Sequence, residues 1–176
     1  MKKTLLIISI LSIVLFLTGC GVFNLNGWIW PEDDLEFAKL ISELNTPELI
    51  GNYMHKNFKY EAHKIYAPDP YTLWKTGKGD CNDFSTFGQF MAYRNGIEAY
   101  TILISFKGTF YNHMIAVYVE DYGKSFTDNR RYLNNNGFYF NSFREIVDYD
   151  TENYIGLRWT KYIVYDYNME KIEEGE

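Results

Sequence analysis

One cysteine near the middle of the chain stands where a nucleophile could act. Cys81 lies in the segment Gly77-Lys78-Gly79-Asp80-Cys81-Asn82-Asp83, directly before a helical pattern of apolar residues. A thiol attacks a carbonyl carbon well only as the thiolate, so it needs groups that lower its pKa and a donor that holds the oxyanion. The unpaired amides and the positive dipole end of a helix N-terminus do part of both. Cys81 is therefore the candidate nucleophile.

The acids beside this cysteine leave its environment ambiguous. Asp80 and Asp83 oppose a thiolate by their charge, unless they cap the first helical turn and are held away from the sulfur. Activation then has to come from a histidine, and downstream of Cys81 the chain offers only His113. His113 begins a predicted strand.

Strand faces connect His113 to a carboxylate. With a hairpin turn at Tyr122-Gly123, Val117 pairs with Asp128, which puts Asp128 on the face of His113 and turns Asn129 the other way. This register leaves Asp128 four residues along from His113, roughly 13 Å at strand rise and too far for a hydrogen bond. Direct opposition needs a register two pairs off, or a bulge, and a two-pair shift preserves the face.

At these positions the sequence resembles the transglutaminase-like superfamily. The resemblance runs from about Pro47 to Asp128 and is carried by Gly79-Asp80-Cys81 followed by Asp83, a helix ending at Asn95-Gly96-Ile97, His113 opening a strand, and Phe126-Thr127-Asp128 one hairpin later. It implies a papain-like core in which Cys81 is the nucleophile, His113 the general base and acid, and Asp128 the residue that orients the imidazole.

The chain departs from the family pattern at two points. The family often has an aromatic residue soon after the histidine, where this chain has Met114, and no glutamine lies just upstream of Cys81 as a second oxyanion donor. The Trp74 indole is our candidate for that donor. A metal site from Asp80, Asp83 and His113 is disfavoured, because no second histidine stands at ligand spacing, so we expect no metal and no cofactor.

The first residues have the form of an export signal. Lys2-Lys3 precedes an apolar run from Leu5 to Leu17, and Leu17-Thr18-Gly19-Cys20 follows. This resembles the bacterial lipoprotein signal, which implies that residues 1–19 are removed and that Cys20 is lipidated and cannot pair with Cys81. An ordinary secretory signal with a coincidental cysteine is the alternative. We expect a lipid anchor in the cell membrane or outer membrane, facing outside the cytoplasm.

Composition limits the remaining chain to one domain. Removing residues 1–19 leaves 157 residues and takes the formal charge from −6 to −8, because the segment carries two lysines and no acid. Nucleic acid is an improbable partner at this charge, and contact with a membrane would come from the lipid alone. We divide the chain into the signal 1–19, a lipidated tether 20–30, a domain 31–168 that resembles the transglutaminase-like superfamily, and an acidic, frayed tail 169–176.

Helical patterns precede strand patterns along the chain. Helices are predicted from Pro31 to Leu44, from Pro47 to Phe58, from Cys81 to Asn95, and from Ser142 to about Val147. Strands are predicted over 97–106, 114–120, 125–127, 137–140 and 154–167, with a loop over 60–79. This order predicts an α+β domain with a mainly antiparallel sheet. His55 and His63 are expected to be packed or exposed, without a chemical role.

Two kinds of function fit these features. The first is an envelope-anchored cysteine enzyme that forms a thioester at Cys81 from an amide carbonyl and passes the acyl group to water or to an amine. Peptidase, amidase and transglutaminase differ only in that acceptor, and the substrate is a peptide, a protein or a peptidoglycan peptide. The second is a catalytically inactive lipoprotein that binds a peptide or cell-wall glycan in the same groove.

Overall fold

The computed structural model describes residues 34–62, 69–129 and 131–176. The predicted signal, Cys20, the tether, the helix start at Pro31 and His63 lie outside these ranges. In the described part no helix is both long enough and apolar enough to cross a membrane.

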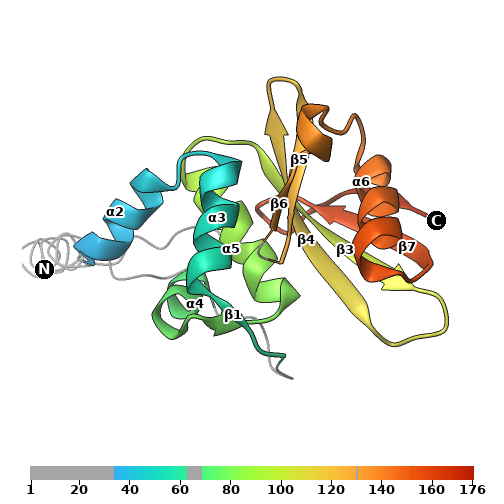
Figure 1. Ribbon diagram of the computed structural model, residues 1–176, viewed down its shortest axis with the longest axis horizontal. Helices are drawn as coiled ribbons and strands as arrows, with labels where there is room; N and C mark the ends of the chain where they lie inside the picture. Colours follow the sequence, from blue (N-terminus) through green and yellow to red (C-terminus); the bar gives the residue numbers. More distant parts are fainter. Residues whose placement is uncertain (1–33, 63–68, 130) are drawn as a thin grey trace, which may run out of the picture.

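Four helices gather on one side of a sheet, and a fifth covers the other side (Figure 1). The four are α2 (Leu35–Glu43), α3 (Pro47–Asn57), α4 (Pro70–Thr76) and α5 (Cys81–Arg94), and the fifth is α6 (Phe143–Asp150). Each begins after a residue whose side chain accepts a hydrogen bond from a first-turn backbone N–H, which satisfies one of the otherwise unpaired donors. These caps are Asp34, Thr46, Asp69, Asp80 and Ser142.

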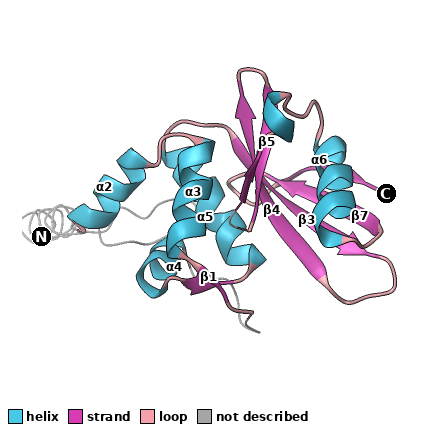
Figure 2. Cartoon of the chain, in the orientation of Figure 1, coloured by secondary structure: helices cyan, strands magenta, loops and turns pink. Residues whose placement is uncertain are grey.

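The main sheet has six antiparallel strands in the order β6-β5-β4-β3-β7-β8. In chain order they are β3 (Ala99–Phe106), β4 (Asn112–Glu120), β5 (Gly123–Asp128), β6 (Arg131–Leu133), β7 (Trp159–Tyr165) and β8 (Lys171–Gly175). Figure 2 shows most helices on one side of the main sheet and α6 on the other, and the predicted α+β class is confirmed. A small parallel pair, β1 (Lys59–Tyr60) and β2 (Lys78–Gly79), leads into Cys81.

The core has two parts, one on each face of the sheet. On the side of α2 to α5, aromatic side chains from the helices pack over Ala116 and Tyr118 of β4. On the other face, Ile115 and Val117 pack with side chains of α6. The alternation along β4 thus follows the two-residue period of a strand.

Small residues let α5 lie close to the sheet. A side-chain carbon on Gly88 would stand 2.5 Å from the Tyr118 hydroxyl oxygen and 3.2 Å from the Ala116 Cβ. Gly88 therefore gives this helix a face that packs closely against β4. The contact determines how near the first turn of α5 lies to β4.

The segment 60–79 was predicted to be one loop. It instead contains β2 and α4. Asp69 caps α4 and Pro70 is its first residue, the same arrangement that Thr46 and Pro47 form at the start of α3. The helix ends at Gly77, whose φ of +65° suits glycine. On α3, Leu49 is 44% exposed and lies outside the buried face formed by Pro47, Ile50, Gly51 and Met54.

Three further predictions about strands are wrong. Only Phe140 of the predicted strand 137–140 makes a bridge, to Lys124, and β6 stands earlier in the chain. The predicted long strand 154–167 begins only at Trp159, after a π-helical turn, Thr151–Ile155, that ends at Gly156. The acidic end is not frayed: it forms β8 on the edge of the sheet, where Lys161 and Lys171 lie 3.1 and 3.2 Å from Glu174.

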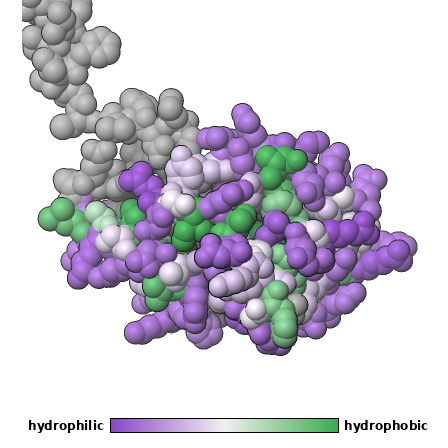
Figure 3. Space-filling view, turned by 90° about the horizontal axis from the view of Figure 1, so that it is seen from above, coloured by the Kyte–Doolittle hydropathy of each residue, from purple (hydrophilic) through white to green (hydrophobic). Residues whose placement is uncertain are grey.

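Hydrophilic residues cover most of the surface seen in Figure 3, and hydrophobic residues stand there in small separate groups. This distribution is ordinary for a protein surface in contact with water.

Candidate active site

Cys81 is the first residue of α5 and is partly exposed. Asp80 and Asp83 form a capping box around it: the Asn82 N–H donates to Asp80 Oδ1 at 3.0 Å, and the Asp80 N–H donates to Asp83 Oδ2 at 2.7 Å. Both carboxylates are thus engaged with backbone donors of the first turn. The Cys81 N–H is among the first amides of the helix, which have no intrahelical acceptor.

Glycine is required immediately before this turn. A side-chain carbon on Gly79 would lie 2.6 to 2.9 Å from three atoms of the Asp83 side chain, too close for any other residue without movement. The Glu61 N–H donates to the Gly79 carbonyl at 2.8 Å, so the strand pair and the capping box together fix the entry into α5.

His113 and Asp128 lie together on neighbouring strands. His113 Nε2 is 3.0 Å from Asp128 Oδ1, and both side chains are buried. The Asn129 amide donates to the same oxygen at 2.9 Å, and Arg131 donates to Oδ2 at 3.1 Å. The carboxylate is therefore held by three partners with the imidazole as one of them.

The hairpin register differs by two residues from the one we assumed. Val117 pairs with Phe126, and Glu120 pairs with Gly123 around a turn at Asp121-Tyr122. One step further along, Asp128 stands opposite Ile115, two residues from His113, or about 7 Å of strand rise that the two side chains bridge. The predicted shared face is correct, whereas Asn129, expected to point away, contacts Asp128 through its side chain.

The imidazole of His113 is only 1% exposed. Burial by itself lowers its pKa, but the hydrogen bond with Asp128, the interaction with Cys81 and the charge of Asp150 outweigh burial and raise the pKa to about 10. Nδ1 makes no hydrogen bond of regular geometry among the described residues. The effect of Cys81 on the pKa of His113 indicates that the thiol is near the ring, although no hydrogen bond between them is formed, as in many unliganded sites.

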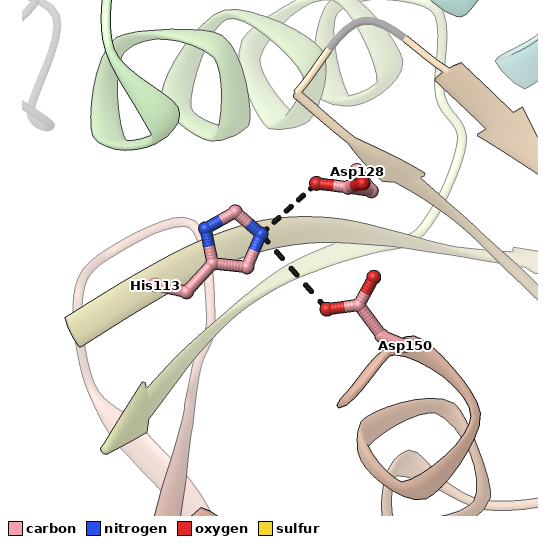
Figure 4. Close-up of side chains that lie close together, drawn as sticks. All are labelled: His113, Asp128 and Asp150. Atoms are coloured by element: carbon pink, nitrogen blue, oxygen red, sulfur yellow. Dashed lines mark hydrogen bonds and ion pairs between the residues drawn. The ribbon is translucent and has the colours of Figure 1, made fainter. Parts of the chain in front are cut away.

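A second carboxylate reaches the same ring nitrogen. Asp150 Oδ2, at the end of α6, is 3.9 Å from His113 Nε2 (Figure 4). We did not predict this residue, although a signal existed. The buried residues of α6 recur at helical spacing, and Asp150 is the last member of that stripe: Phe143, Ile146, Val147 and Asp150.

A possible metal-ligand atom from each of three residues lies within 4.8 Å of the other two, close enough to bind one cation: His113, Asp128 and Asp150. We interpret the cluster as hydrogen-bonded, because a metal on Nε2 would replace the 3.0 Å bond to Asp128. The ligand set that we considered from the sequence is not formed, since Asp80 and Asp83 cap α5.

Trp74 lies in the helical layer, with its ring centroid 5.0 Å from that of Phe37 and the Lys75 ammonium 4.2 Å from its ring. These contacts do not support the predicted oxyanion role of the indole, which stays a prediction. His55 is exposed, as expected.

A cysteine at a helix N-terminus, beside a histidine and an aspartate on adjacent antiparallel strands, is the arrangement that the transglutaminase-like resemblance implies. The three residues belong to α5, β4 and β5 of the α+β fold.

No known protein family matches this sequence, and neither does any curated protein. Among solved structures, LapG of Legionella pneumophila is similar at 18% identity and a TM-score of 0.46, over 56% of this chain and 64% of LapG. EGTA-treated LapG of the same organism is similar at 15% identity and a TM-score of 0.48, over 74% of each chain. A Cytophaga hutchinsonii protein, provisionally assigned as a cysteine protease, is similar at 12% identity and a TM-score of 0.46, over 80% of this chain and 49% of its own.

Proposed function

We propose that the protein is a cysteine-dependent acyl-transfer enzyme that acts on amide bonds. The observation that carries the proposal is the position of Cys81, at the N-terminus of α5 and beside an imidazole that is hydrogen-bonded to Asp128. Helix dipole and imidazolium both favour a thiolate at this sulfur. The buried carboxylate keeps the ring oriented, as in other nucleophile, base and acid triads.

The reaction has two steps. The Cys81 thiolate attacks the amide carbonyl carbon, the C–N bond breaks, and His113 gives its proton to the leaving amine, which leaves a thioester. Water or a second amine then attacks the thioester, His113 takes the proton from that nucleophile, and the Cys81 thiolate leaves as the carbon–sulfur bond breaks. The Cys81 N–H is the first candidate donor to the oxyanion in each step.

Tyrosines at the rim of the site suit a peptide substrate. Tyr60 and Tyr111 are 48% and 45% exposed, and burial together with the charge of a Cys81 thiolate raises the pKa of each phenol. The charge of Cys81 thus reaches both phenols, which belong to β1 and to the loop between β3 and β4. Exposed phenols offer apolar surface and hydrogen bonds to a peptide, a protein or a peptidoglycan peptide.

We also propose that the enzyme is anchored in the cell envelope through a lipidated Cys20. The support is the sequence alone: two lysines, a short apolar run, and Leu-Thr-Gly before the cysteine. A lipid on Cys20 would leave Cys81 as the single thiol of the mature chain.

Trapping of the acyl-enzyme tests the proposal. The mature protein is incubated with p-nitrophenyl acetate, and the Cys81 peptide is examined by mass spectrometry. We expect one acetyl group on Cys81 that hydroxylamine removes, and faster loss of that group to cadaverine than to water if the enzyme is a transamidase.

His113→Ala should abolish this acetylation, whereas His55→Ala, which alters an exposed histidine, should leave it unchanged. Acetylation that is equal in all three proteins, or absent from a folded wild-type protein, would contradict the proposal and favour a binding protein without catalysis.

A further inference from the structure

Asp150 is a buried acid with no ordinary partner. Its side chain is fully buried, and neither oxygen accepts a hydrogen bond among the described residues. It occupies a position on α6 where the other buried residues are apolar. An unpaired carboxylate in such a place costs several kcal/mol, so a residue that only filled space would be better replaced by an apolar one.

The nearest cationic group is the imidazole of His113. Asp128 and Asp150 approach the same nitrogen of the ring from two sides, while the other nitrogen points away from both (Figure 4). Asp128 makes the shorter contact, 3.0 Å, and Asp150 the longer one, 3.9 Å. The 3.9 Å distance is too long for a hydrogen bond but short enough for a strong charge interaction in a buried site.

We infer that Asp150 is a positioning residue for His113, a second carboxylate that acts with Asp128 to fix the ring and to favour its protonated form. The inference rests on the proposed function, because the protonated ring is the form that gives a proton to the leaving amine. It adds a fourth member, from α6, to the site built by α5, β4 and β5.

The charge of Asp150 is itself variable. Burial and the charge of Asp128 raise its pKa, His113 and Arg131 lower it, and the balance is a pKa of about 7. The titratable or charged groups that face it are His113 on β4, Asp128 on β5 and Arg131 on β6, and its charge also reaches Tyr111. As Asp150 ionises, the negative charge beside the imidazole increases.

Titration of His113 followed by NMR of the imidazole tests the inference without catalysis. In Asp150→Asn we expect the pKa of His113 to fall by about 1 unit or more, because a negative charge beside the imidazolium is lost. Glu152→Gln removes an exposed carboxylate two residues further along and should leave the titration unchanged. An unchanged His113 titration in a folded Asp150→Asn protein would overturn the inference.

The second readout is the pH profile of Cys81 acylation by an amide, p-nitroacetanilide, whose leaving amine takes its proton from the imidazolium. The alkaline limb, where the imidazolium loses its proton, should move to lower pH in Asp150→Asn. A merely structural role would lower the rate at every pH and leave the limb in place, which would also overturn the inference.

If Asp150→Asn does not fold, the wild-type protein still decides the question. Its His113 resonances should shift near neutral pH as Asp150 ionises, before the ring loses its proton, and a flat response there would contradict the inference. A wild-type Cys81 that is not acetylated, together with a normal His113 response, would contradict the proposed function and not the placement of Asp150.

Discussion

At the scale of single residues, the site depends on how firmly the imidazole is held. Asp128 receives hydrogen bonds from Asn129 and Arg131 besides its contact with His113, so its own side chain has little freedom. A fixed carboxylate selects one orientation of the ring and stabilises the charge that develops on it. The charge of the Asp128 carboxylate should therefore affect the reactivity of the site more than the shape of this side chain does.

Asp128→Asn keeps the shape and removes the charge. We expect the second-order rate of Cys81 acetylation to fall on the order of 10²-fold, because the amide can still hydrogen-bond to the ring but no longer stabilises an imidazolium. Asp121→Asn, in the exposed turn of the same hairpin, is the matched control and should stay within about 2-fold of wild type. Equal effects of the two substitutions would show that Asp128 does not orient the histidine.

Asp150 should make stability depend on pH in a defined direction. Its pKa is 3.8 as a model carboxyl and about 7 in the folded protein, so the folded state holds the proton more tightly. The contribution of Asp150 to the free energy of unfolding therefore decreases as pH rises from about 4 to about 7. Asp150→Asn should remove this loss, so that its advantage over wild type grows by about 4 kcal/mol across that range.

Urea denaturation near pH 4 and near pH 8 measures this difference. A free energy of unfolding that differs between the two proteins by the same amount at both pH values would show that Asp150 does not hold its proton through this range.

At the scale of elements, the distance between α5 and the sheet governs the distance between Cys81 and His113. Gly88 sets that distance, because a methyl group there would collide with Tyr118 and Ala116. The clash involves a buried tyrosine whose hydroxyl is hydrogen-bonded to Thr127 at 3.0 Å, so that side chain cannot easily move aside.

Gly88→Ala should destabilise the protein by about 1–2 kcal/mol, since overpacking outweighs the gain in helix propensity. It should also slow Cys81 acetylation by displacing the first turn of α5. Thr86→Ala, on the same helix and only partly buried, should change neither property appreciably. A more stable Gly88→Ala protein with full reactivity would show that α5 can move without loss of the site.

Local signals were sufficient for some elements and not for others. The starts of α3 and α6 were predicted at Pro47 and Ser142, because the capping signals there depend on neighbouring residues only. The acidic strand β8 was missed because its stability comes from pairing with β7 and from lysines on both strands. The predicted hairpin register was wrong because it depended on the choice of turn residues.

At the scale of the whole molecule, the site combines elements from both faces of the sheet. Cys81 and the pair His113 and Asp128 could be predicted, because a helix start and the parity of two strands are local features of the sequence. Asp150 could not be placed in the site without knowing that α6 crosses the sheet beside β4 and β5. Its position depends on tertiary packing.

The proposed anchor makes a separate prediction for the whole protein. The mature chain should sediment with membranes and be released by detergent but not by high salt, because two acyl chains bury more methylene groups than a chain of charge −8 could match by ionic contact. Cys20→Ser should lose lipid labelling and accumulate as a precursor. Mature protein that begins at another residue and is free of membranes would contradict the anchor and leave the site unaffected.

The reactivity of Cys81 tests the central claim most directly. The rate of alkylation by iodoacetamide is measured near neutral pH for wild-type protein, His113→Ala and free cysteine. We predict that wild-type Cys81 reacts at least about 10-fold faster than free cysteine, since helix dipole and imidazolium stabilise its thiolate, and that His113→Ala loses this advantage. A folded wild-type protein whose accessible Cys81 reacts no faster than free cysteine would contradict the account.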